Sequence, residues 1–388
     1  MIMENNNDNK VLNVPHLRFP KFSGEWEICK VSELLDFYST NSLSWEQLEY
    51  GEKAMMNLHY GLIHVGLPTM VDLRRDKLPN VKEGNMPKNF ELCKEGDVAF
   101  ADASEDTNEV AKVIELFNLD NKDIVCGLHT IHGRDNKNKT IVGFKGYAFS
   151  SSAFHNQIRR IAQGTKIYSI STKNFSECYV GIPSKAEQTK IATLLRLIDE
   201  RIATQNKIIE KLQSLIKGLN DNIHKGIKGE TVCFSDLGEA YSGLSGKGGD
   251  DFGYGEPFIT YMNVYQNTYI SEKDYELVQI APNEKQNSVQ YGDALFTLSS
   301  ETPEEVGIGA VYLGNTQKLY LNSFCFVIHF YDERVLTQYL AHFISSSSFR
   351  RAIYPLAQGS TRFNLQKNDF MKMKFLLPSL EKQGHIAN

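Results

Sequence analysis

The chain of 388 residues lacks any apolar run close to the roughly 20 residues that a helix needs to span a bilayer. Its first ten residues, MIMENNNDNK, also lack the basic segment followed by an apolar stretch that marks a secretory signal. These absences predict a cytoplasmic protein with no membrane partner, and the polar start predicts a disordered tail over residues 1–15. Hydrophobic residues make up 41% and charged residues 23% of the chain, which is typical of globular domains.

Cysteine is sparse and scattered. The six cysteines stand at positions 29, 93, 126, 178, 233 and 325, and no two are close enough in sequence to form a CxxC pair for a metal or a redox reaction. His129 and His132 form an HxxH without a nearby third ligand, which is more typical of a strand or turn than of a metal site. We therefore expect reduced, mostly buried thiols and no metal.

Catalytic signatures are missing as well. The chain has no Pro-Pro pair, hence no NPPY-like methyltransferase motif, and no HExxH or Ser/His/Asp motif stands out. Residues 238–255 hold seven glycines, but Lys247 is followed by Gly248 rather than by Ser or Thr. This stretch therefore predicts a mobile surface loop and not a phosphate-binding loop. We expect a non-catalytic chain that binds no cofactor itself.

Excess positive charge is also absent, since the formal net charge is −5. This argues against a protein that holds nucleic acid alone through bulk electrostatics. It is compatible with a protein that reads DNA through a few local contacts while its partners supply further positive charge.

What the sequence does contain is an internal duplication. Residues 96–110 (GDVAFADASEDTNEV) match residues 292–306 (GDALFTLSSETPEEV) at seven positions, all 196 residues apart. Two further pairs of segments match at a spacing of 195: 150–165 with 345–360, and 181–192 with 376–387. A period of this length indicates two domains of one fold rather than a solenoid.

Within each copy, short apolar runs rich in Val, Ile, Phe and Tyr alternate with turns. The runs KTIVGFKG, ECYVGI, PFITYMNVY and FCFVIHF predict strands, and LTQYLAHFISS (336–346) predicts a helix. The fold class we expect is α+β, with two similar domains built on mixed β-sheets. The first domain is predicted over residues 16–182 and the second over residues 229–377.

A long helix is predicted between the two domains, over residues 183–228. Some 35 residues at 1.5 Å each make a rod of roughly 50 Å. Its seam follows heptad spacing: Leu195, Ile198, Ile202, Gln205, Ile209, Leu212, Ile216 and Leu219. Burying the seven aliphatic side chains is worth about 10 kcal/mol, so the seam calls for a partner helix. The alternative is an ordinary amphipathic helix that lies on one domain.

A second helix of the same kind begins at Pro378, where PSLEKQGHIAN matches PSKAEQTKIAT of the first copy. The sequence stops at Asn388, so residues 378–388 are expected to be the truncated start of this second helix. An exposed seam is then expected to drive homodimerisation or to destabilise the chain.

These motifs resemble the specificity (S) subunit of Type I restriction-modification systems. The most specific segment is IPSKAEQTKIATLLRLIDERIATQNKIIEKL (182–212). The resemblance also rests on LHYGLIHV (58–65), GDVAFADASED (96–106), GLHTIHGRD (127–135), GDALFTLSSETPEEVG (292–307), LAQGSTRFNL (356–365) and FLLPSLEKQ (375–383). The short second helix departs from the family's pair of conserved helices.

The resemblance implies a DNA-binding, non-catalytic subunit with two target recognition domains. Each domain would read one half of a bipartite site in double-stranded DNA, and the helices would set the spacing. The chain would dock DNA methyltransferase (M) subunits and, through them, motor-nuclease (R) subunits; these partners would use S-adenosylmethionine, ATP and Mg. The alternatives are a coiled-coil interaction protein and an inactive, truncated remnant of such a subunit.

Two kinds of segment are candidates for contact with DNA, because they carry amide, hydroxyl or basic side chains in turns. The turn at 132–139 supplies Arg134, Lys137 and Lys139, and its alternative role is a solvated hairpin tip. The duplicated AQG segments are stronger candidates, since glycine beside small hydroxyls lets a backbone approach a phosphate closely; a structural turn is their alternative role. They supply Gln163, Thr165, Lys166, Gln358, Ser360, Thr361 and Arg362.

Overall fold

The structure is a computed structural model that describes residues 15, 17–51 and 55–387. It separates into two compact units, Met1–Gln205 (unit 1) and Asn206–Asn388 (unit 2), with the division inside helix α6 (Lys185–His224). The predicted tail falls almost wholly outside the described residues, and the predicted domain limits stay a prediction. Among the described residues, no helix has the length and apolar character to cross a membrane.

Unit 1 is built on a five-stranded mixed sheet in which only β5 and β9 run parallel. In sheet order its strands are β2 (Asp36–Tyr38), β11 (Thr130–Arg134), β7 (Val98–Ala101), β9 (Val113–Asn118) and β5 (Met70–Asp72). A four-stranded sheet has the order β10 (Asp123–Cys126), β4 (Met55–Leu58), β6 (Asn80–Val81) and β3 (Leu48–Glu49). Two antiparallel pairs complete it: β1 (Glu27–Lys30) with β13 (Tyr179–Ile182), and β8 (Ala103–Ser104) with β12 (Tyr168–Ser169).

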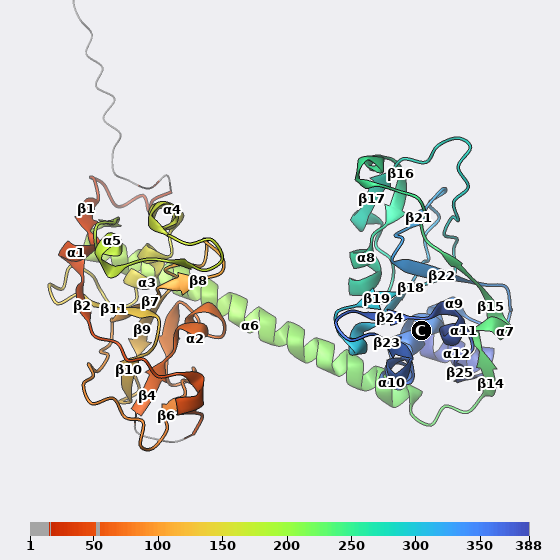
Figure 1. The fold of residues 1–388 in the computed structure, drawn as a ribbon, viewed down its shortest axis with the longest axis horizontal. Coiled ribbons are helices and arrows are strands. Elements are labelled where there is room, and N and C mark those ends of the chain that lie inside the picture. Colours follow the sequence, from red (N-terminus) through yellow and green to blue (C-terminus); the bar gives the residue numbers. More distant parts are fainter. Residues whose placement is uncertain (1–14, 16, 52–54, 388) are drawn as a thin grey trace, which may run out of the picture. The chain divides into compact units, whose positions relative to one another are not determined.

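Short helices connect these strands (Figure 1). They are α1 (Val31–Leu34), η1 (Trp45–Gln47), α2 (Tyr60–His64), α3 (Lys145–Phe149), α4 (Ser152–Ile161) and α5 (Thr172–Ser176). The core forms around Phe100 of β7, whose ring lies against Phe149 of α3 and Phe175 of α5 at centroid distances of 5.1 and 4.6 Å. The three rings are fully buried, so the helices are held to the sheet by apolar packing.

Unit 2 repeats this arrangement with fewer strands. Its central antiparallel sheet has the order β15 (Gly238–Ser242), β22 (Cys325–Phe330), β18 (Ala294–Thr297) and β20 (Gly309–Val311). A mixed sheet has the order β17 (Tyr275–Val278), β16 (Phe252–Ile259) and β21 (Tyr320–Leu321). The smaller sheets are β19 (Ser299–Ser300), β24 (Phe363–Leu365) and β23 (Ala357–Gln358), and the pair β14 (Glu230–Cys233) with β25 (Lys374–Leu377).

Helices cover the sheets of unit 2 as well. They are α7 (Phe234–Leu237), η2 (Gly249–Asp251), α8 (Tyr261–Gln266), η3 (Glu272–Asp274), η4 (Pro303–Glu305), α9 (Thr337–Ile344), α10 (Ser347–Ile353), η5 (Tyr354–Leu356), α11 (Lys367–Met371) and α12 (Leu380–Ala387). Phe296 of β18 takes the place of Phe100, and it packs against Phe326 and Phe370. Two similar α+β domains with mixed sheets are thus confirmed.

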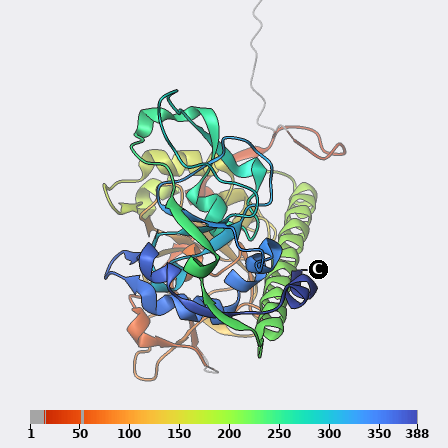
Figure 2. The same cartoon turned by 90° about the vertical axis from the view of Figure 1, so that its right-hand side faces the viewer.

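The long helix α6 runs unbroken over 40 residues (Figure 1 and Figure 2). The buried Gln188 side chain anchors its start: its amide oxygen accepts from the Ile141 N–H, and its Nε2 donates to the carbonyls of Lys139 and Pro183. Gln383 makes the equivalent three bonds at the start of α12. The duplication therefore extends to the way each helix leaves its domain.

Three local predictions are wrong. The run KTIVGFKG forms no strand, because the buried Glu115 carboxylate accepts the N–H groups of Gly143 and Gly146 in place of a neighbouring strand. PFITYMNVY is only half strand, since Thr260 caps α8 by accepting from the Asn263 N–H.

The third concerns residues 238–255, which are not one loop but contain β15, η2 and the start of β16. A Cβ at Gly238 would lie 2.2 Å from the His329 carbonyl oxygen. This glycine therefore permits a close pairing of strands rather than mobility.

Candidate nucleic-acid interface

The duplicated AQG segments form two matching hairpins, one in each unit. In unit 1, Gln163 and Ser169 exchange backbone hydrogen bonds of 3.0 and 2.9 Å. In unit 2, Gln358 of β23 pairs with Asn364 of β24. Each hairpin follows a short helix whose first turn is capped by a serine hydroxyl: Ser151 for α4 and Ser346 for α10.

Glycine at the tip of each hairpin is a geometric requirement. Gly164 has φ of +146° and Gly359 has φ of +143°, values that other residues rarely adopt. A Cβ would lie 1.9 Å from the Ile167 carbonyl oxygen at Gly164 and 2.0 Å from the Arg362 carbonyl oxygen at Gly359. Both copies thus keep the same backbone, which presents the residues after the glycine to solvent.

The side chains predicted for these hairpins are all exposed: Gln163, Thr165, Lys166, Gln358, Ser360, Thr361 and Arg362. The Arg362 guanidinium lies 5.8 Å from the centre of the Phe324 ring, a cation–π distance that orients the side chain across the turn. Each tip therefore combines an amide, a hydroxyl and a cation, which suits contact with phosphates and base edges.

The arginines beside the hairpins have different roles. Arg160 of α4 and Arg351 of α10 are exposed. Arg350 instead donates to the carbonyls of Gly307, Glu304 and Val306, and burial lowers the pKa of its guanidinium. Arg350 therefore has a structural role. Arg159 is exposed but donates to the side-chain oxygens of Asn108 and Asn156, whereas Arg160 and Arg351 are exposed beside the hairpins.

The turn at 132–139 buries Arg134, leaves Lys139 half-buried and exposes Lys137. Arg134 is 7% exposed, and its guanidinium donates to Asp97, to Glu91 and to the Leu92 carbonyl. This burial argues against Arg134 as a DNA contact, because its donors are already used inside unit 1.

The two lysines of the same turn reach back toward β1 and α1. Lys137 donates to the Glu33 carbonyl and Lys139 to the Glu27 carboxylate. The AQG hairpins are therefore the better-presented candidates.

Asp97 is the hub of a buried polar network in unit 1. It accepts from Arg134 and forms a bond of 2.7 Å with Nε2 of His132. Burial alone raises the pKa of Asp97, but the bonds from His132 and Arg134 outweigh it, so the pKa is lowered. Its counterpart Asp293 is bonded by Tyr241 and His329, and there burial prevails and the pKa is raised.

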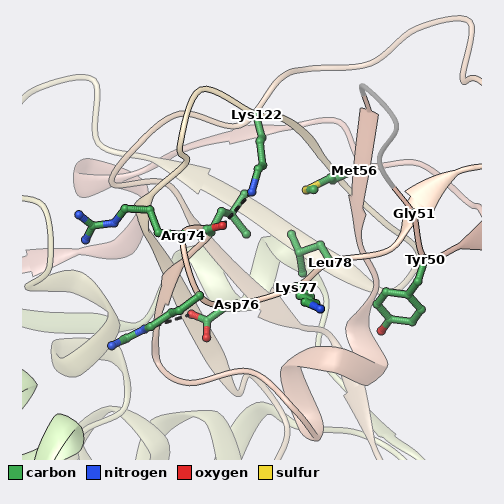
Figure 3. Close-up of a pocket in the computed structure, with 10 residues that line it drawn as sticks. Tyr50, Gly51, Met56, Arg74, Asp76, Lys77, Leu78 and Lys122 are labelled. Carbon is green, nitrogen blue, oxygen red and sulfur yellow. Dashed lines mark hydrogen bonds and ion pairs between the residues drawn. The ribbon is translucent and has the colours of Figure 1, made fainter.

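A basic hollow of about 640 Å³ in unit 1 was not expected from the sequence. Figure 3 shows Arg74, Lys77 and Lys122 around it, together with Asp76 and Tyr50. Asp72 pairs with Arg74, and Lys122 donates to the Leu73 carbonyl. The adjacent Arg74 and Arg75 are a sequence signal for local positive charge, but they are not among the site residues predicted from the sequence. Three cations of the hollow are already paired with carboxylates: Arg74 with Asp72, Arg75 with Asp76 and Lys122 with Asp120. The hollow is therefore less basic than its lysines and arginines suggest.

The predicted seam of α6 remains largely in contact with solvent. Six of its side chains are 45–66% exposed: Ile198, Ile202, Ile209, Leu212, Ile216 and Leu219. Leu195 is half-buried and Gln205 is exposed. Further exposed aliphatic residues widen the apolar face beyond the predicted seam: Leu194, Leu197, Ile208, Leu215 and Ile223. The ends of the helix are anchored: Asp199 accepts from the Tyr147 hydroxyl in unit 1, and Asp221 accepts from Ser347 in unit 2.

The chain thus combines two duplicated α+β domains, matching hairpins and a long helix with an exposed apolar face. The model of the family "Type I restriction modification DNA specificity domain" matches residues 76–214 and 229–388, and the chain belongs to this family. It is 25% identical over 273 residues to the Type I restriction enzyme EcoKI specificity subunit of Escherichia coli (strain K12). That match covers 63% of this chain and 57% of the relative, so it spans less than two thirds of the relative's length.

Solved structures show the same fold. The S subunit of a Type I restriction-modification system from M. genitalium aligns with a TM-score of 0.53 and 14% identity, over 94% of this chain and 87% of that one. A structure from work on complex assembly and conformational transition of the Type I R-M system aligns with a TM-score of 0.52 and 15% identity, over 96% and 90%. These likenesses confirm the α+β two-domain fold with its long helix.

Proposed function

We propose that this chain is the DNA sequence-recognition subunit of a Type I restriction-modification complex. Each unit reads one half of a bipartite site in double-stranded DNA. The observation that carries this proposal is the pair of AQG hairpins, which keep one glycine-dependent backbone in both units and expose a hydroxyl and a cation after it. On this shared backbone Lys166 stands where the second copy has Thr361, and Arg362 stands where the first copy has Ile167. These differences suit two unlike half-sites.

The chain itself is proposed to be non-catalytic and to bind neither S-adenosylmethionine nor ATP with Mg. These belong to the methyltransferase subunits and to the motor-nuclease subunits that assemble through them. Support comes from the absence of methyltransferase and Walker motifs in the sequence.

The apolar face of α6 supports the docking of a helical partner. Side chains such as Ile209 and Leu212 stay about half exposed, so covering the face recovers much of the burial energy that the sequence predicts. We assign this face to the methyltransferase subunits. Pairing with a second copy of the chain through the exposed seam is the competing use.

Salt-dependent DNA binding tests the proposal. The subunit is co-purified with its methyltransferase, and affinity for duplex DNA is measured at increasing salt. Each phosphate contact contributes about 0.9 to the slope of log affinity against log salt, so Lys166→Ala and Arg362→Ala should each reduce the slope by about that amount. Lys88→Ala, an exposed lysine on another loop, is the matched control and should leave the slope unchanged. A slope that neither hairpin variant changes would contradict the assignment of the hairpins.

A further inference from the structure

Three donor side chains meet inside unit 1, and the two cysteines among them are 33 residues apart in sequence. Cys126 ends β10, His132 lies in β11, and Cys93 is attached to β10 by its N–H, which donates to the Ile124 carbonyl. The sulfur atoms of Cys93 and Cys126 are 3.6 Å apart, and the nearest donor atoms of all three residues lie within 4.8 Å of one another. None of the three is more than 5% exposed.

The imidazole of His132 is oriented by a hydrogen bond at one ring nitrogen, while the other ring nitrogen has no partner in the part of the chain that the structure describes. Its Nε2 lies 2.7 Å from the Asp97 carboxylate, which fixes the ring. Its Nδ1 is buried and has no hydrogen-bond partner among the described residues. A buried nitrogen without a partner is costly, and a carboxylate on the far side of the ring is the arrangement that orients a metal-binding histidine.

The equivalent positions of unit 2 can be identified from matching backbone hydrogen bonds, and they show which residues the same fold carries without a cluster of metal-binding side chains. The Cys93 N–H donates to the Ile124 carbonyl, and at the equivalent place the Val289 N–H donates to the Leu319 carbonyl. The Asp97 N–H donates to the Lys94 carbonyl, and the Asp293 N–H to the Gln290 carbonyl. These bonds align residue 93 with 289 and residue 97 with 293.

The strand registers complete the alignment. Val98 pairs with Gly133 in unit 1, and Ala294 pairs with Ile328 in unit 2. Gly133 and Ile328 are thus equivalent and 195 residues apart. The same spacing aligns Cys126 with Leu321 and His132 with Val327. The counterparts of the three donors are therefore Val289, Leu321 and Val327, which all belong to one buried apolar cluster.

We propose that Cys93, Cys126 and His132 bind one transition-metal ion, with zinc the best fit. Two thiolates and an imidazole are borderline-soft ligands, which suit Zn²⁺ and not Mg²⁺ or Ca²⁺. Tetrahedral zinc with sulfur at about 2.3 Å places two sulfurs about 3.8 Å apart, close to the observed separation. Two thiolates would neutralise the charge of a divalent ion. The charge of Asp97 is separately neutralised by its ion pair with Arg134.

The ion would tie the segment before β7 to β10 and β11, so its role is structural. The Asp97–Arg134 pair, bonded to His132, sets the orientation of the ring, and Asp97 is thus a positioning residue. No CxxC pair marks the site, because β-sheet pairing and not sequence spacing brings the donors together. Apolar residues at all three matching positions of the second copy are the signal that reveals it.

Metal content of the full-length protein, purified without chelators, tests the proposal. We expect about one zinc per chain by mass spectrometry. Replacement by Co²⁺ should give the visible bands of a tetrahedral site and the near-ultraviolet charge transfer of cobalt-bound thiolate. Zinc well below one per chain together with no thiolate band on adding Co²⁺ would overturn the proposal.

Variants locate the ion. The triple variant Cys93→Val, Cys126→Leu, His132→Val copies unit 2 and should fold without metal, whereas Cys178→Ala, a buried thiol elsewhere in unit 1, should keep it. Should the triple variant fail to fold, Cys126→Ser serves instead, and it should lose about half of the charge-transfer intensity. An unchanged cobalt spectrum in Cys126→Ser, or full zinc in a folded triple variant, would place the ion elsewhere and refute the site.

Discussion

The anchor of α6 gives a prediction that can be worked through in numbers. Gln188 is fully buried and makes hydrogen bonds of 2.9, 3.1 and 2.9 Å to Ile141, Lys139 and Pro183. Gln188→Leu keeps the size of the side chain and removes all three. At about 1 kcal/mol per bond, unit 1 should lose about 3 kcal/mol of its free energy of unfolding. With a urea dependence of about 2–3 kcal/mol per molar, the midpoint should fall by about 1 M.

The two tryptophans make this measurement specific to one unit. Trp26 and Trp45 both lie in unit 1, so tryptophan fluorescence follows the unfolding of that unit alone. Gln383→Leu, the same change in unit 2, should leave the fluorescence midpoint in place and lower a transition seen only by circular dichroism. Gln213→Leu, at an exposed position of α6 outside the predicted seam, controls for the substitution itself. A fluorescence midpoint that Gln188→Leu does not lower would refute the reasoning.

Three further predictions concern the hairpin, the seam and α10. Gly359→Val should weaken DNA binding by the assembled complex in gel-shift titrations, because its Cβ would meet the Arg362 carbonyl; Gly384→Val, with open space around it, should not. Ile209→Glu should lower the yield of methyltransferase that co-purifies with the chain, because it places a charge on the apolar face; an unchanged yield would contradict that docking role. Hydrogen bonds from Ser347 lower the pKa of the Asp221 carboxyl group in the folded protein. Their contribution to the free energy of unfolding is therefore complete above the ordinary aspartate pKa of about 3.9, and it is lost as the pH falls through the lower pKa of the folded state. Asp221→Asn should therefore destabilise unit 2 in urea melts at pH 6 and have little effect at pH 2; an equal effect at both would count against this linkage.

Much of the fold could be predicted because the sequence contains two copies of the same domain. Apolar periodicity is clear in the duplicated GD segments, in FCFVIHF and in the helix at 336–346. The structure confirms the last two as β22 and α9. KTIVGFKG could not be interpreted in this way, because the groups that accept its N–H hydrogens belong to Glu115 on a distant strand. Periodicity contains no information about such long-range polar contacts.

The same limit applies to the candidate site. The hairpins were predictable, since their glycines and small polar residues occur in both copies. Arg134 is indistinguishable in sequence from an exposed basic turn residue, and only the position of Asp97, directly before the neighbouring strand β7, shows that it is buried. The hollow at Arg74 and the cluster around Cys93 likewise depend on sheet order, which a single sequence does not define.

A map of methylated adenines shows most directly whether the two units read two half-sites. The chain is expressed with its methyltransferase subunit in cells that lack other DNA methylation, and the genome is sequenced for the modified base. We expect one bipartite motif with two unlike halves. Replacing Thr165 and Lys166 by alanine should relax the sequence requirement only in the half that unit 1 reads. Methylation at a palindrome, or none in an assembled complex, would contradict the claim that the two units read two half-sites.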